Sequence, residues 1–134
     1  MSDKLPNETP ILRVPATPQN VNALGDIFGG WLISQADIAG SILAHTRAKG
    51  RVVTVAVNHF QFIKPVYVGD LVSYFGNIAN IGTTSIRIAL EIFVERLDGE
   101  HIHCEKVGTS EITYVAIDQN RKPRPVPAQA PSPD

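Results

Sequence analysis

Cysteine, excess charge and long apolar runs are all scarce in this sequence. A single cysteine, Cys104, among 134 residues excludes an internal disulfide and a cysteine-based zinc site. The charges of the 12 basic and 13 acidic residues nearly cancel. The sequence therefore lacks the basic excess that is typical of nucleic-acid-binding proteins. The uncharged stretch over residues 27–36 is about half of the length that a membrane-spanning helix needs. The polar N-terminal segment lacks the apolar run of a secretory signal, which predicts a cytoplasmic protein without a membrane partner.

Proline is also scarce in the middle of the chain. Only Pro65 of the 10 prolines lies between residues 19 and 122. Proline lacks the N–H donor that sheets and helix interiors require, so proline-dense ends do not join such elements. We therefore predict loose tails over residues 1–9 and 126–134, and one domain over residues 10–125, a size typical of a single domain.

Hydrophobic periodicity predicts one long helix among several strands. Apolar residues recur at helical spacing over residues 28–49, and Gly50 is typical of a helix end. Alternating or β-branched patterns predict strands at residues 11–14, 51–60, 71–80, 84–97 and 101–117. The later connections are too short for crossovers, so these strands are expected to pair antiparallel.

These elements predict an α+β fold, in which a sheet of about five antiparallel strands wraps around one long central helix. One helix cannot cover both faces of such a sheet, and the strand edges also need a partner. We therefore expect a homo-oligomer, with a dimer as the minimum.

Asp37 is the first candidate catalytic residue. It is the only formally charged residue between residues 27 and 46, and aspartate is disfavoured inside a helix. Partial burial under a sheet would favour the uncharged carboxyl, a property that suits a general base. A hydrogen-bonded structural aspartate, or an exposed one, is an equally open interpretation.

A glycine-rich segment before the helix is the second candidate. Asn22, Gly29 and Gly30 lie where the helix is expected to begin. Helix N-terminal amides carry positive partial charge, so with the Asn22 side chain they can form an oxyanion hole. An ordinary glycine-rich loop remains the alternative. The Lys-Ser/Thr of a phosphate-binding loop does not follow Gly30.

Two motifs near the predicted helix start carry a family resemblance. They read Asn-x-x-Gly-x-Ile-Phe-Gly-Gly-Trp and Ser-Gln-x-Asp, both within residues 20–44. With residues 50–57, 62–70 and 82–95, they resemble the YciA-type acyl-CoA thioesterases of the hotdog-fold superfamily. The resemblance covers roughly residues 11–125.

The resemblance implies a fold, an activity and a site. It implies a hotdog fold working as a dimer, with trimers of dimers common, and hydrolysis of acyl-CoA to free acid and CoA without metal or organic cofactor. The family's catalytic carboxylate falls on Asp37, its asparagine on Asn22 and its helix-start amide on Gly29 or Gly30. Asn22 and Asp37 of one pocket are then expected to come from opposite subunits. Asp37 would activate a water or attack the thioester to form an anhydride.

CoA carries three phosphate groups, so basic residues near the pocket are candidate contacts, although each alone is more often a solvated surface charge. These candidates are Arg51, Lys64, Arg87, Arg121, Lys122 and Arg124. The turn Thr83, Thr84 and Ser85 offers further donors and matches a family stretch near the nucleotide. Asn58 and His59 lie near the expected pocket and are included as substrate contacts.

Two rival functions remain open. A strand histidine facing an acidic helix residue is the catalytic pair of hotdog dehydratases, which would use His59 with Asp37. The His-Phe-Pro-Gly-type segment of those enzymes is absent, because Gln61 follows Phe60. A non-catalytic acyl-CoA-binding protein is the second rival. His101, His103 and Cys104 are too weak a pattern to predict a metal site.

Overall fold

The computed structural model describes residues 3–129 as one long helix, one short 3-10 turn and five strands. The elements are β1 (Leu12–Pro15), η1 (Pro18–Asn20), α1 (Gly29–Ala48), β2 (Val52–Phe62), β3 (Leu71–Ile81), β4 (Ser85–Asp98) and β5 (His101–Ala116). The predicted helix and strands are all present, each within a few residues of its expected bounds. The outermost parts of the two predicted tails, residues 1–2 and 130–134, lie outside the described residues.

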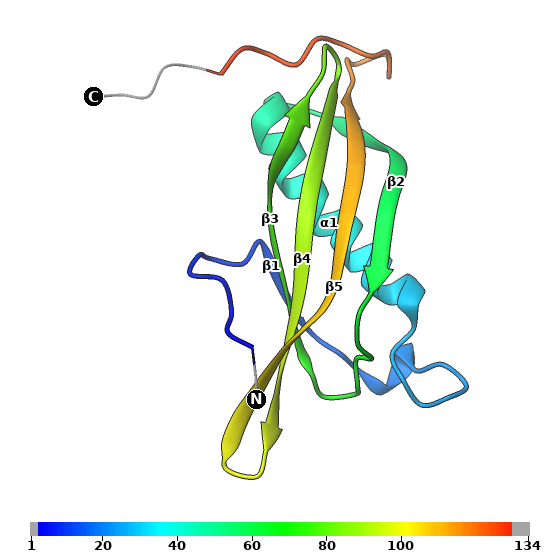
Figure 1. Ribbon diagram of the computed structural model, residues 1–134. Helices are drawn as coiled ribbons and strands as arrows, with labels where there is room; N and C mark the ends of the chain where they lie inside the picture. Colours follow the sequence, from blue (N-terminus) through cyan, green and yellow to red (C-terminus); the bar gives the residue numbers. More distant parts are fainter. Residues whose placement is uncertain (1–2, 130–134) are drawn as a thin grey trace.

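The five strands form one antiparallel sheet in the order β1-β3-β4-β5-β2. Figure 1 shows α1 lying along one face of this sheet, with β2 at one edge and β1 at the other. The predicted α+β architecture is therefore confirmed. Within residues 3–129, no helix is both long and apolar enough to cross a membrane.

The core lies between α1 and the sheet. Alternate residues of β4, including Ile86, Ile88 and Ile92, are fully buried on the face toward the helix, as strand periodicity predicts. The helix meets them with small residues such as Ala36 and Ala39, which are also fully buried. Small side chains let the helix approach the sheet closely, and the large strand side chains fill the remaining space.

The helix ends at a left-handed residue. Lys49 has φ of 54° and donates its backbone N–H to the carbonyl of His45, which satisfies one of the last helical acceptors. Gly50 follows, so the chain can turn directly into β2. This turn brings the start of β2 back alongside the second half of the helix (Figure 1).

One side of the molecule remains apolar and uncovered. Ile38 and Ile42 on α1 and Val55 and Val57 on β2 are each about half exposed, and β2 is an edge strand. An edge strand with apolar side chains is a template for pairing with another chain. This face is therefore suited to contact a second protein surface.

Parts of both predicted tails contact the domain. Asp3 donates its backbone N–H to the carbonyl of Cys104 and accepts from the Lys106 backbone N–H through its carboxylate, at 2.8 Å each. At the other end, the Val126 backbone N–H donates to Thr83. These segments are not strands or helices, as their prolines predicted, but hydrogen bonds hold them to the rest of the structure.

Candidate active site

Asp37 lies halfway along α1, on the side that faces β2 and β5. Its side chain is half-buried. The Thr54 hydroxyl donates to Oδ1 at 2.7 Å, and the Tyr114 hydroxyl donates to the same atom at 3.1 Å. Thr54 and Tyr114 are direct partners in the β2–β5 register, so both side chains point to the helix. Two donors from the sheet therefore stabilise the carboxylate at Oδ1, and Oδ2 remains for a ligand.

The helix start presents backbone donors to a hollow. No side chain caps α1 at Phe28, so the first helical amides, including those of Gly29 and Gly30, have no partner within the helix. Asn22 and Gly29 line a hollow of about 340 Å³ that also touches Phe62 at the end of β2. An anionic oxygen placed there would meet the positive end of the helix.

The Asn22 side chain is held by its own turn. Its Oδ1 accepts the backbone N–H groups of Leu24 at 2.9 Å and Asp26 at 3.1 Å. These two bonds identify the oxygen of the amide and leave its Nδ2 group as the donor that faces away from the turn. The structure thus brings Asn22 and Gly29 together, but it places Asp37 outside the residues that line their hollow.

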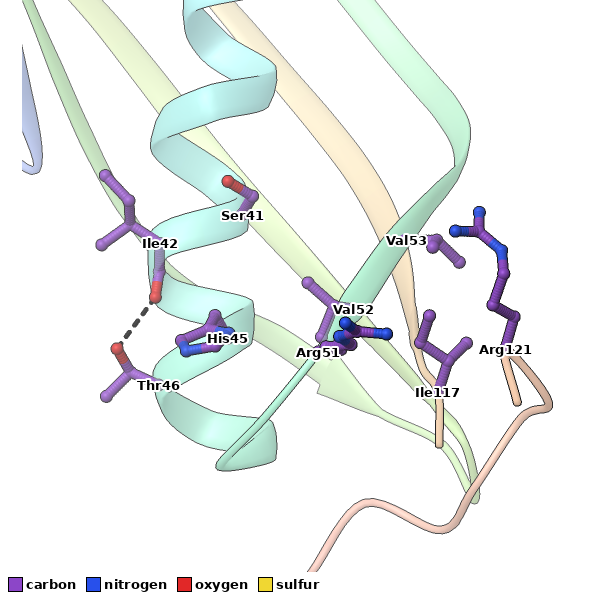
Figure 2. A pocket seen from close by; sticks show the side chains of 9 residues that line it. All are labelled: Ser41, Ile42, His45, Thr46, Arg51, Val52, Val53, Ile117 and Arg121. Atoms are coloured by element: carbon purple, nitrogen blue, oxygen red, sulfur yellow. Dashed lines mark hydrogen bonds between the residues drawn. The ribbon is translucent and has the colours of Figure 1, made fainter. Parts of the chain in front are cut away.

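The predicted basic contacts fall into two places. Lys64 lines the Asn22 hollow and lies 3.3 Å from the carboxylate of Glu105. Arg51 and Arg121 line a second hollow of about 600 Å³ near the end of α1. Figure 2 shows this hollow, with His45 on the helix and Arg51 at the start of β2. A hollow bordered by several basic groups is suited to an anionic ligand.

The remaining predicted substrate contacts differ in whether they already form hydrogen bonds within the protein. Arg124 donates to the carbonyls of Ile117 at 3.0 Å and Ala48 at 2.9 Å, so its guanidinium fastens the helix end. Lys122 is exposed, as is Arg87 on the sheet. The turn Thr83, Thr84 and Ser85 joins β3 to β4, and two of its carbonyls accept from Ala116 and Val126.

His59 does not face Asp37 within the chain. It pairs with Glu111 in the β2–β5 register, and residues of β5 alternate between the two faces of the sheet. Since Tyr114 points to the helix, Glu111 and His59 point to the opposite face, where the His59 ring contacts the Thr109 hydroxyl at 3.2 Å. Asn58 accepts from the Thr113 hydroxyl. The structure therefore does not assemble the His59–Asp37 pair of a dehydratase.

Thr54 and Tyr114 are site residues that sequence reasoning missed. Both come from strands that are distant from Asp37 in sequence, and a hydroxyl in a strand carries no local signal of such a contact. The pairing register alone places them under the helix. Within residues 3–129, no cluster of three or more histidine, cysteine or acidic side chains is arranged to hold a metal ion.

Comparisons with known proteins define the class of this chain. Residues 24–99 match the model of the thioesterase superfamily. The chain is 47% identical to the acyl-CoA thioester hydrolase YciA of Salmonella typhimurium, over 95% of this chain and 96% of that protein. The chain therefore belongs to the thioesterase superfamily and, within it, to the family of YciA acyl-CoA thioester hydrolases.

Solved structures agree in fold. A hexameric hotdog fold thioesterase of Campylobacter jejuni has a TM-score of 0.85 and 36% identity, covering 88% of this chain and 90% of that one. An acyl-CoA hydrolase from Staphylococcus aureus, solved with butyryl coenzyme A and coenzyme A, has a TM-score of 0.78 and 28% identity, covering 92% of this chain and 74% of that one. The sheet and helix described above are thus a hotdog fold.

Proposed function

We propose that this protein hydrolyses acyl-CoA thioesters to free acid and CoA, with Asp37 as its catalytic carboxylate. The observation that carries the proposal is the setting of Asp37, a lone half-buried carboxylate held by Thr54 and Tyr114. The names of the relatives support the substrate class, since those enzymes are acyl-CoA thioester hydrolases.

Residue spacing in the Staphylococcus aureus enzyme supports the same site. Its solved alanine variants replace an asparagine, an aspartate fifteen residues later and a threonine seventeen residues after the aspartate. Asn22, Asp37 and Thr54 have the same two spacings in this chain. We infer that these three residues act together here, and that Thr54 contributes by its hydrogen bond to Asp37.

The start of the helix supplies the hydrogen-bond donors that activate the thioester carbonyl in the proposed reaction. The thioester oxygen would accept from Asn22 Nδ2 and from the amide of Gly29 or Gly30, which stabilise the charge that develops on it. In one route Asp37 Oδ2 removes a proton from a water that adds to the carbonyl carbon, the carbon–sulfur bond breaks, and the CoA sulfur takes up that proton to give the thiol. In the other, Oδ2 attacks the carbonyl carbon itself, the carbon–sulfur bond breaks to leave a mixed anhydride, and the CoA thiolate takes up a proton from water. A water then cleaves the anhydride, which releases the free acid and restores the Asp37 carboxylate.

The two halves of the site meet only if two chains pair. Asn22 and Gly29 lie beside Phe62 at the end of β2, whereas Asp37 is bonded to Thr54 near its start. When two copies of β2 pair antiparallel about a two-fold axis, the end of one strand lies opposite the start of the other. We therefore propose that each site combines Asn22 and Gly29 of one subunit with Asp37 of its partner.

The exposed apolar face of α1 and β2 supports this pairing, because a second copy would bury it. Hexameric relatives support a homo-oligomer, and we propose a trimer of dimers. Arg51, Arg121 and Lys122 are proposed to contact the CoA phosphates, since their side chains are exposed near one end of the helix. We also propose that the reaction needs no metal or organic cofactor, and a cytoplasmic location stays a prediction.

Replacement of Asp37 by asparagine tests the proposal. Asparagine keeps an Oδ1 that Thr54 and Tyr114 can donate to, but it loses the base, and a positioned base contributes about 10²–10⁴ in rate. Thiol release from acyl-CoAs of graded chain length is measured with a chromogenic thiol reagent. The single cysteine is buried, so the protein itself should react slowly with the reagent.

Asp98→Asn is the matched control, because it removes a carboxylate at the remote end of β4. We expect Asp37→Asn to lose at least about a hundredfold in kcat and Asp98→Asn to match wild type. An Asp37→Asn variant within about threefold of wild type would show that Asp37 is not the base. Addition of a chelator is expected to leave the rate unchanged.

A further inference from the structure

The hydroxyl of Tyr114 lies within hydrogen-bond distance of two oxygens of one helical residue, which share its single proton. It lies 2.8 Å from the backbone carbonyl of Asp37 and 3.1 Å from Oδ1 of the same residue. The Tyr114 side chain is fully buried in the sheet. We propose that Tyr114 is a positioning residue that fixes the direction of the Asp37 carboxylate, and that Gly40 provides the room for it. This inference rests on the proposed role of Asp37.

Gly40 makes the contact possible. A Cβ atom on Gly40 would lie 2.3 Å from the Tyr114 hydroxyl and 3.1 Å from its ring. A glycine inside a helix costs stability relative to alanine, and Gly40 lies in the interior of α1. Because Gly40 has no side chain, the Tyr114 hydroxyl can approach the helix closely enough to reach the backbone carbonyl of Asp37.

A second buried tyrosine provides an internal comparison. Tyr74 on β3 is also fully buried, and its hydroxyl donates to the backbone carbonyl of Leu32 at 3.2 Å. Both tyrosines thus fasten the sheet to α1 by a hydroxyl-to-carbonyl bond. Only Tyr114 also contacts a carboxylate. A purely structural role would be shared by the two residues, whereas an effect on Asp37 would be specific to Tyr114.

The phenol remains a donor at any working pH. Burial raises the pKa of Tyr114 above its ordinary value, and the neighbouring Asp37 carboxylate raises it further. The hydroxyl therefore remains able to donate to the Asp37 carboxylate. Its loss leaves Thr54 as the remaining donor from the sheet to Oδ1, so the carboxylate is held less firmly in direction.

Other ionisable groups on the packed elements do not face Asp37. On β3 the ionisable side chain is Tyr74, which bonds to Leu32. The nearby ionisable groups on the other three strands point to the face of the sheet away from the helix, as the register shows. They are His59 on β2, Arg87 and Glu91 on β4, and Glu111 on β5. On α1 itself the next titratable residue is His45, about two turns away. The side chains of the sheet that orient Asp37 are therefore its two hydroxyl partners, Thr54 and Tyr114.

The experiment compares kcat and KM of Tyr114→Phe and Tyr74→Phe for acyl-CoA hydrolysis, with Tm measured on each variant. For Tyr114→Phe we expect kcat to fall about tenfold with little change in KM. Tyr74→Phe loses the matching sheet-to-helix bond and should keep the wild-type kcat. A Tyr114→Phe enzyme with the wild-type kcat would overturn the inference, as would the same loss of kcat in Tyr74→Phe.

Gly40→Ala gives a second measurement, including the case in which Tyr114→Phe does not fold. Its methyl group displaces the hydroxyl, so it should also lower kcat with little change in KM, and an unchanged kcat counts against the proposal. Adding Gly40→Ala to Tyr114→Phe should cost less than the sum of the two single effects. If Asp37→Asn is itself fully active, the proposed function fails first. If it is inactive and Tyr114→Phe keeps the wild-type kcat, only the role of Tyr114 fails.

Discussion

Restoration of activity by mixing two inactive variants would show that the site is shared between subunits. One variant is Asp37→Asn. The other is Asn22→Asp, which keeps the Oδ1 acceptor for the Leu24 and Asp26 amides but replaces the Nδ2 donor by a carboxylate oxygen. Each variant alone should be nearly inactive, because every site in its homodimer carries one defect.

The size of the recovery follows from the two-fold symmetry of the proposed dimer. In a mixed dimer, one site receives both defects and the other combines the intact Asn22 of one chain with the intact Asp37 of its partner. Random assembly from equal amounts makes about half of the dimers mixed, and half of their sites are intact. The mixture should therefore recover about a quarter of the wild-type kcat per chain.

Co-expression with two different affinity tags provides the assay. Tandem purification isolates assemblies that hold both chains. Almost every hexamer of three randomly formed dimers does so, and the expected recovery stays near a quarter of wild type, whereas an isolated dimer would recover about half. Co-expression of two differently tagged Asp37→Asn chains is the control for the tags. Recovery no greater than that control would refute the shared site and would place Asn22 and Asp37 of one pocket in the same chain.

Two further predictions concern stability and its dependence on pH. Asp70 is 1% exposed and accepts hydrogen bonds from Nε and Nη2 of Arg96, at 2.8 and 2.7 Å. Asp70→Ala should cost about 3–5 kcal/mol and lower Tm by roughly 10 °C or more in scanning calorimetry. Glu95→Ala, which breaks a partly exposed pair with Arg13, should cost at most about 1 kcal/mol, and equal losses would contradict the reasoning. The His103 contact, followed by Lys64, lowers the pKa of Glu105 below its ordinary value. The stabilisation by Glu105 is thus present above about pH 4.3 and lost as the pH falls below it. Urea unfolding of Glu105→Gln should show a weaker loss of stability on acidification, and an unchanged slope would exclude this contribution.

Local patterns in the sequence were sufficient to predict the secondary structure. The alternation of Ile86, Ile88 and Ile92 predicted the buried face of β4, because side chains of a strand alternate between its two faces. The helical spacing predicted α1 nearly to its ends. Asp37 was singled out because it is the only formally charged residue between residues 27 and 46, a property that needs no tertiary information.

The surroundings of Asp37 could not be predicted in the same way. Thr54 and Tyr114 lie 17 and 77 residues from it in sequence, and neither stands out within its own strand. The rival pair of His59 and Asp37 is not formed within the chain for a related reason, because the face toward which a strand residue points depends on register. The two register shifts in β2 change which of its side chains point to the helix.

The sequence by itself determined the elements of this protein, its family and its one central carboxylate, because these depend on the order and spacing of neighbouring residues. Only the tertiary structure decided which donors reach Asp37, that Gly40 admits the Tyr114 hydroxyl, and that Asn22 lines a hollow apart from Asp37. Those relations depend on the register of paired strands and on the packing of a helix against them, and both are set by contacts between residues far apart in the chain.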